Sequence, residues 1–98
     1  MKAARSLTQA AAEGLAIQAL TFIAQDGERL GRFLAETGLG PAEIRAAARD
    51  PGFLAGVLDH VASDQRLIES FAAAAGLDPA EIDKARVALG GDWEREVP

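Results

Sequence analysis

The chain has 98 residues, of which 49% are apolar, and its formal net charge is −5. This length fits one compact domain, 1–98, and the acidic balance argues against nucleic acid and anionic membranes as default partners. The absence of cysteine excludes disulfides and thiolate metal sites, and the single histidine, His60, offers little to a metal ion.

The start of the chain does not predict a signal peptide. Met1 to Arg5 is mildly basic, but polar residues follow it where a signal peptide would have an apolar run. No stretch reaches the length of about 20 apolar residues that crosses a bilayer. We expect a cytoplasmic protein without a membrane span.

The first predicted helix runs from about Leu7 to Gln25. Ser6 and Gln9 have the spacing of a capping box at its start. Apolar residues cover roughly two-thirds of its circumference, which is far wider than the stripe of a surface helix. We expect the central helix of the domain here; in the alternative, part of the arc, with Ile17, faces a partner or a second copy.

Glycine and proline mark the ends of the next two helices. Asp26 caps a helix over about 27–37, and Gly38 followed by an apolar residue predicts a Schellman ending. Gly40-Pro41 opens the following helix, because proline at the first helical position sacrifices no hydrogen bond. That helix stops before Asp50-Pro51, since proline disfavours helical geometry in the residue before it.

The second half of the chain carries the same kinds of signal. The expected helices run from Pro51 to about Ala62, from a cap at Ser63 or Asp64 to Gly76, and from Asp78-Pro79 to Gly90-Gly91. No segment alternates as a strand would. The prediction is therefore an all-α protein of about six helices.

An internal repeat appears at an offset of 38 residues, the separation of Gly38 and Gly76. Apolar positions and caps match at this offset, and 41–44 equals 79–82 residue for residue. The match predicts a small orthogonal helical bundle built from two similar three-helix repeats, about 7–49 and 50–90. The alternative is that alanine-rich helices with common caps align by chance.

A helix-turn-helix DNA-binding motif is the sharpest functional look-alike. The segment 33–45 has two helices around a glycine turn, and Arg45 and Arg49 could reach a groove. Affinity for DNA depends largely on neutralising phosphates, however, and Glu36 and Glu43 flank the supposed reading helix of an acidic chain. DNA binding stays an alternative, and we do not expect nucleic acid as the partner.

His60 suggests either a phosphorylatable histidine or a metal ligand. At the repeat offset it matches Phe22, and on its own helix it flanks an apolar row, so a partly buried packing role is simpler. The nearest carboxylates along the chain, Asp59 and Asp64, could equally be solvated. A small enzyme or phosphotransfer protein using His60 remains the second alternative.

Nothing else in the chain predicts chemistry. No phosphate-binding glycine loop occurs, and the serines have no evident base beside them. Most carboxylates fall near helix starts, where negative charge is favourable. We therefore expect no enzyme, no catalytic residue, no metal and no cofactor.

The segment 91–98 is expected to be a C-terminal tail after the Gly-Gly stop. Its tryptophan, Trp93, either folds back onto the core or is displayed to a partner. The charged residues around it are expected to fray.

Several segments together resemble one family. They are LAIQAL at 15–20, RLGRFL at 29–34, TGL at 37–39, DPGFL at 50–54 and GLDP at 76–79. From about Ala11 to Gly90 the chain resembles domain of unknown function 3572, a family of short alphaproteobacterial proteins. The resemblance implies no activity, cofactor or catalytic residue, and at most a signalling context. His60 departs from the aromatic residue more common there, which weakens the phosphohistidine alternative.

These observations favour a protein–protein interaction or adaptor module. The expected partner is another protein or a second copy of this chain. The candidate contacts are Ile17, Arg29, Arg32 and Trp93.

Overall fold

The computed structural model describes residues 8–95 of the chain, with the surroundings of side chains up to Gly90. Within that span it contains six helices and no strand, which confirms the all-α prediction. The helices are α1 (Gln9–Ala24), α2 (Gly27–Thr37), α3 (Pro41–Ala47), α4 (Pro51–Ala62), α5 (Gln65–Ala75) and α6 (Pro79–Arg95). None of them combines the length and the apolar character that crossing a membrane demands.

The first helix begins later than predicted, whereas the third has the predicted bounds. α1 begins at Gln9, two residues later than expected, because the extended residue Thr8 is its N-cap and accepts a hydrogen bond from the Ala11 N–H. The expected cap at Ser6 lies outside the described residues. α3 begins at Pro41 and ends at Ala47, before Asp50-Pro51, as predicted.

The predicted stop at Gly90-Gly91 is wrong, because α6 continues to Arg95. A glycine inside a helix costs about 1 kcal/mol relative to alanine, but it ends the helix only when its backbone turns left-handed. Among the described residues only Gly38 (φ 76°) and Gly76 (φ 70°) do so.

The helix ends at these two glycines are not identical. After α5, the Leu77 N–H donates to the Ala72 carbonyl at 2.9 Å, which is the long bond of a Schellman motif. After α2, the Gly38 N–H donates to the Leu34 carbonyl. The Leu39 N–H, however, donates to the Thr37 hydroxyl at 3.3 Å rather than to a helix carbonyl. The predicted Schellman ending is therefore present at Gly76 and replaced by the simpler left-handed cap at Gly38.

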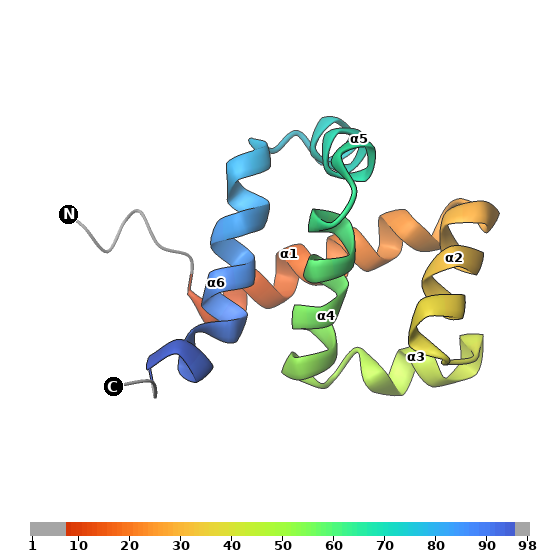
Figure 1. Cartoon of the computed structure of the whole chain (residues 1–98), viewed down its shortest axis with the longest axis horizontal. Coiled ribbons are helices and arrows are strands. Elements are labelled where there is room, and N and C mark those ends of the chain that lie inside the picture. Colours follow the sequence, from red (N-terminus) through yellow and green to blue (C-terminus); the bar gives the residue numbers. More distant parts are fainter. Residues whose placement is uncertain (1–7, 96–98) are drawn as a thin grey trace.

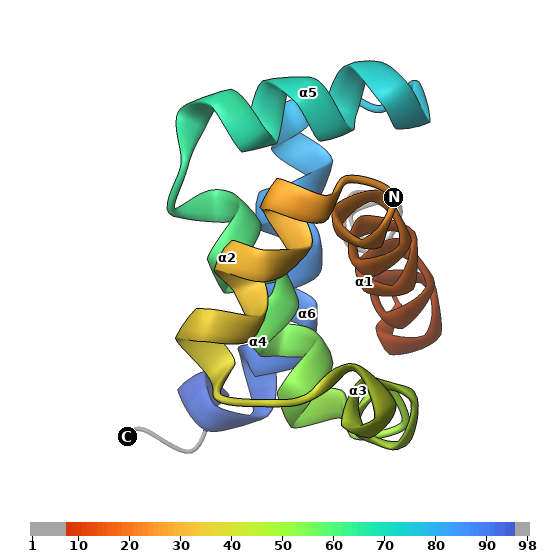
Figure 2. The same ribbon diagram turned by 90° about the vertical axis from the view of Figure 1, so that its right-hand side faces the viewer.

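α1 is the central helix, as predicted. It runs across α4 and α6, and these three helices form the closest pairs of the fold (Figures 1 and 2). Six of its residues are buried: Ala12, Leu15, Ala16, Ala19, Leu20 and Ile23. Most of the broad apolar arc is thus covered within the chain, while Ile17 stays 45% exposed.

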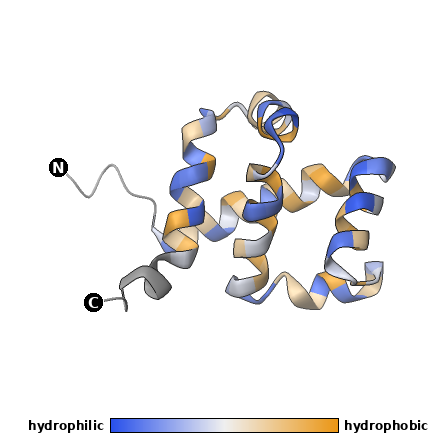
Figure 3. Ribbon diagram, in the orientation of Figure 1, coloured by the Kyte–Doolittle hydropathy of each residue, from blue (hydrophilic) through white to orange (hydrophobic). Residues whose placement is uncertain are grey.

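α2 stands at one side of this core and carries hydrophilic residues along much of its length (Figure 3). It packs on α1 and reaches α4 through one buried ring, Phe33. This ring lies 6.0 Å from Phe53 and 5.1 Å from His60 between centroids, both in edge-to-face geometry. The contact between α2 and α4 is therefore made by these three rings.

Local structure recurs at the offset of 38 residues. The bounds of α2 and α5 match at this offset, as do the N-caps Asp26 and Asp64 and the left-handed glycines. The third helices differ, because α3 has 7 residues and none buried, whereas α6 has 17 and packs on α1 and α4. That the two halves share one three-helix arrangement stays a prediction.

Candidate functional site

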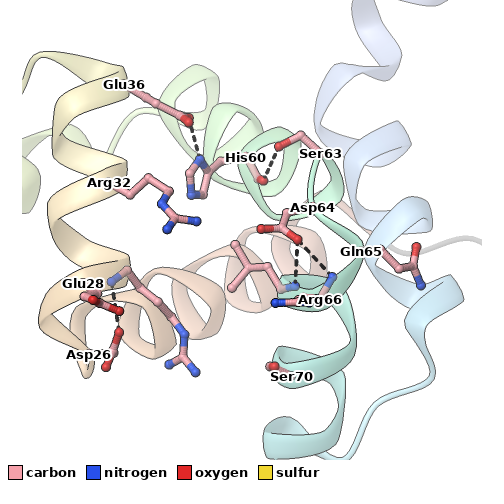
Figure 4. A pocket seen from close by; sticks show the side chains of 12 residues that line it. Asp26, Glu28, Arg32, Glu36, His60, Ser63, Asp64, Gln65, Arg66 and Ser70 are labelled. Carbon is pink, nitrogen blue, oxygen red and sulfur yellow. Dashed lines mark hydrogen bonds and ion pairs between the residues drawn. The ribbon is translucent and has the colours of Figure 1, made fainter.

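A groove of about 620 Å³ opens where α2, the end of α4 and the start of α5 meet (Figure 4). We call it the arginine groove and define it by Arg29, Arg32, Glu36, His60, Asp64 and Arg66. The spacing of 29, 32 and 36 places the α2 residues on one helix face. His60 comes from the last turn of α4, and Asp64 and Arg66 begin α5.

His60 and Glu36 form a pair across the groove. The imidazole Nδ1 lies 2.8 Å from the Glu36 Oε1, and the ring packs edge-to-face on Phe33. Only 10% of the His60 side chain is exposed, against 58% of Glu36. His60 thus has the partly buried packing role that the sequence predicts, together with a carboxylate partner that it does not predict.

This pairing leaves the other imidazole nitrogen free for the groove. In the tautomer that carries its proton on Nδ1 and donates it to the carboxylate, Nε2 has a free lone pair. Nε2 has no hydrogen bond to the described residues, and no buried side-chain nitrogen or oxygen among them lacks a partner. Nε2 is therefore not completely buried, and it lies on the side where Arg32 extends from α2 (Figure 4).

The two carboxylates expected near His60 have other partners. Asp59 accepts a hydrogen bond from the Arg86 Nε at 3.0 Å and so links α4 to α6. Asp64 is the N-cap of α5 and accepts from the Arg66 and Leu67 backbone N–H groups. Glu36, which pairs with His60 instead, lies 24 residues away on another helix.

Three guanidinium groups border the groove without a carboxylate partner. Within the described part of the chain, no ion pair joins Arg29, Arg32 or Arg66 to an acidic side chain. The Arg29 guanidinium lies 4.1 Å from the centroid of the Phe22 ring instead. Asp26, which also lines the groove, accepts from the Arg29 backbone N–H, so its carboxylate serves the cap of α2.

A second hollow of about 380 Å³ adjoins the arginine groove and shares Glu36, His60 and Ser63 with it. We call it the aromatic hollow; its remaining walls include Phe33, Phe53, Thr37 and Gly56. The His60–Glu36 pair therefore stands between a polar groove and a largely apolar hollow.

A third hollow, of about 210 Å³, lies between α1 and α5. Each of its lining residues is 38 positions from a residue of the aromatic hollow. The pairs are Gln18 with Gly56, Phe22 with His60, Gln25 with Ser63, Phe71 with Phe33, Ala74 with Glu36 and Ala75 with Thr37. The ring contacts correspond too, since Phe22 lies 5.6 Å from Phe71 as His60 lies 5.1 Å from Phe33.

Four of the groove residues match uncharged residues at the offset of 38. The positions that match Arg29, Arg32, Glu36 and His60 hold uncharged side chains. In that order they are Leu67, Ser70, Ala74 and Phe22. The other two residues that define the groove, Asp64 and Arg66, match the charged residues Asp26 and Glu28.

The other candidate contacts lie elsewhere. Arg29 and Arg32 share the groove, as their common helix face predicts, but Ile17 does not line it. The backbone of Trp93 belongs to α6, and its side chain lies outside the described residues. The sequence did not predict Arg66 and Glu36 as site residues. Its signal for them is position alone: Glu36 lies near the end of α2 and Arg66 near the start of α5, and both helices begin with an aspartate cap.

The DNA-binding and metal-binding alternatives gain no support from the geometry. Arg45 lies in the last turn of the short helix α3, whereas Arg49 follows the end of that helix, so the two do not share one helical face. Among the residues that the structure describes, no three potential metal ligands of the His, Asp or Glu type cluster together.

A family model described as "Protein of unknown function (DUF3572)" matches residues 9–92. Neither the curated proteins nor the solved structures contain a match to the chain. The family match spans all six helices up to the last turn of α6 and agrees with the sequence resemblance. The chain therefore belongs to the DUF3572 family of proteins of unknown function.

Proposed function

We propose that this protein is a binding module for another protein, and that the arginine groove holds an acidic segment of that partner. The observation that carries the proposal is the set of guanidinium groups without carboxylate partners, Arg29, Arg32 and Arg66, on a chain of net charge −5. Guanidinium groups pair with carboxylates through two parallel hydrogen bonds, which gives both affinity and orientation.

The overall negative charge does not prevent this interaction. At physiological ionic strength the Debye length is about 8 Å, so charges on distant parts of the surface are largely screened from the groove. Inside the groove, Asp26 and Asp64 accept hydrogen bonds from helix N–H groups and Glu36 faces His60. Glu28 also lines the groove, so a carboxylate that enters it competes with this side chain for the three guanidinium groups.

Fluorescence anisotropy of a labelled dodecapeptide rich in glutamate tests the proposal. Arg32→Gln with Arg66→Gln should weaken binding about 3- to 30-fold, since two exposed charge contacts contribute up to about 1 kcal/mol each. The matched control is Arg45→Gln with Arg49→Gln, which changes the net charge equally, in α3 and just after it, and should leave the affinity unchanged.

The proposal fails if the two double variants lose affinity equally, because the effect would then be one of net charge. It also fails if the peptide does not bind at low salt, where screening is weakest. Sedimentation equilibrium of the protein alone tests whether the partner is a second copy of this chain. A dimer lost in the Arg32 and Arg66 variant, but kept in the control, would assign the groove to self-association.

The His60–Glu36 pair favours a second candidate, a phosphoryl acceptor. A carboxylate at 2.8 Å from Nδ1 orients the ring and leaves the Nε2 lone pair open to the groove, beside Arg32. Attack of Nε2 on the phosphorus of acetyl phosphate would form an N–P bond and release acetate. Labelling with [³²P]acetyl phosphate that His60→Gln abolishes would support this candidate, and equal labelling of both proteins would exclude it.

A further inference from the structure

We infer that the aromatic hollow takes the side chain of a lysine from a partner protein. The methylene stem of that lysine lies on the aromatic rings of the hollow, and its ammonium group meets the two carboxylates of the lining. The inference goes beyond the proposed function, because it concerns a different cavity and a side chain of the opposite charge.

The charges around the hollow favour a cation. Among the residues that the structure describes, the lining includes the carboxylates of Glu36 and Asp59 and no lysine or arginine. The arginines of the neighbouring groove, Arg29, Arg32 and Arg66, do not line the hollow. An ammonium group that enters the hollow therefore meets acidic side chains without a lining cation that repels it.

The existing partners of these carboxylates do not cancel their charge. The Arg86 guanidinium lies 3.0 Å from Asp59 but also 2.9 Å from Asp83, so one positive charge is shared between two carboxylates. Glu36 pairs with His60, and the neutral imidazole donates a hydrogen bond without bringing a positive charge. This set of five side chains thus keeps a net negative charge.

The hollow suits an apolar stem that ends in a charge. The Phe53 and His60 rings both meet the Phe33 ring edge-to-face, and Phe33 is only 1% exposed. The carboxylates of Glu36 and Asp59 are 58% and 64% exposed, so apolar surface lies deep in the hollow and negative charge lies toward solvent. Lysine has the same order, since its methylene groups pack on apolar surface while its ammonium group stays near solvent.

Gly56 leaves room for this stem. A Cβ atom at this position of α4 would meet no atom within 4 Å and the residue lacks a positive φ, so neither packing nor backbone geometry requires a glycine. The matching position in the other half is Gln18, where the hollow measures about 210 Å³ against about 380 Å³ here. That smaller hollow has Ala74 in the place of Glu36, so it differs from the aromatic hollow in both space and charge.

Selection of a random dodecapeptide library on the full-length protein tests the inference. At about 0.15 M salt, where distant charges are screened, the enriched peptides should share a lysine. Replacing this lysine by norleucine keeps the stem and removes the ammonium group, and it should weaken binding about threefold or more. The comparison uses the unchanged protein and is independent of any effect on folding.

A charge variant of the protein locates the contact. Glu36→Gln with Asp59→Asn removes both charges but keeps an oxygen acceptor for the partner of each side chain, and it should weaken binding of the selected peptide about threefold or more. The matched control is Glu13→Gln with Glu69→Gln, which removes two surface carboxylates outside both cavities, each bonded to a glutamine one turn earlier. The control should leave the affinity unchanged.

A second variant fills the hollow. Gly56→Gln introduces the side chain that the matching position carries, and it should weaken binding of the selected peptide as the charge variant does. Its control is Gly31→Gln, at a helical glycine outside both cavities where a Cβ atom would also meet nothing within 4 Å.

The outcomes separate this inference from the proposed function. No enrichment of lysine, equal binding of the norleucine peptide, or equal losses in a variant and its control would overturn the inference. These results would leave the proposed function standing, because its test uses a glutamate-rich peptide and the groove arginines. Lysine-dependent binding without any binding of the glutamate-rich peptide would support the inference and overturn the proposed role of the arginine groove.

Discussion

Replacing Gly56 with alanine should stabilise the protein. The residue lies inside α4, its φ is not positive, and a Cβ atom there would meet nothing within 4 Å, so the substitution introduces no clash. The helix gains about 0.5–1 kcal/mol, because alanine loses less backbone entropy than glycine when the helix forms. For a domain of this size the midpoint of thermal unfolding should rise by about 2–8 °C.

Circular dichroism during heating, together with urea titration, measures this effect. Gly14→Ala in α1 and Gly31→Ala in α2 serve as references, since a Cβ atom would meet nothing within 4 Å at those positions either. All three substitutions should stabilise by similar amounts and add when combined, because they lie on different helices. A loss of stability at Gly56 alone would refute the reasoning, since it would show that the glycine has a packing role.

The remaining predictions concern helix ends and one ion pair. Gly38→Ala and Gly76→Ala should each cost about 1–2 kcal/mol in urea unfolding, because their φ values of 76° and 70° bring a Cβ close to the carbonyl oxygen. Asp64→Ala should lower the free energy of unfolding by about 0.5–2 kcal/mol, whereas Asp64→Asn should lower it less, because asparagine can also cap α5. Equal losses for the two variants would contradict this. Arg86→Gln should cost less than about 1 kcal/mol, because the side chain is 39% exposed, and urea unfolding should show a smaller difference at high salt. The hydrogen bond to Asp59 raises the pKa of Arg86, so its contribution to stability is complete below the ordinary guanidinium pKa and is lost only as the pH rises through the raised value.

The sequence predicts helix bounds where local chemistry decides them. Asp26 and Asp64 act as N-caps, and Gly38 and Gly76 adopt the left-handed backbone, all within a few residues of the side chains that require it. The prediction fails at Gly90-Gly91, because a glycine pair lowers helix propensity without forcing a turn.

The site was predictable only in part, for a related reason. Arg29 and Arg32 are three residues apart on one helix, so their common face follows from helix geometry. His60 and Glu36 are 24 residues apart, and their contact depends on how α2 is placed against α4. That placement is set by the buried Phe33 ring, which sequence patterning marks as apolar without indicating the ring that it meets.

The comparison of the two hollows explains why His60 and Glu36 should be considered as one feature. A phenylalanine at the matching position, Phe22, makes the equivalent ring contact with Phe71 and needs no polar partner, and its neighbour Ala74 supplies none. A histidine in the same place buries a ring N–H, which is costly unless an acceptor is present. Glu36 provides that acceptor, but it does so from the surface, where a solvated glutamate would otherwise be neutral for stability. Packing alone is thus satisfied by the phenylalanine and alanine combination, whereas the histidine requires the carboxylate of Glu36, so the two residues form one polar feature.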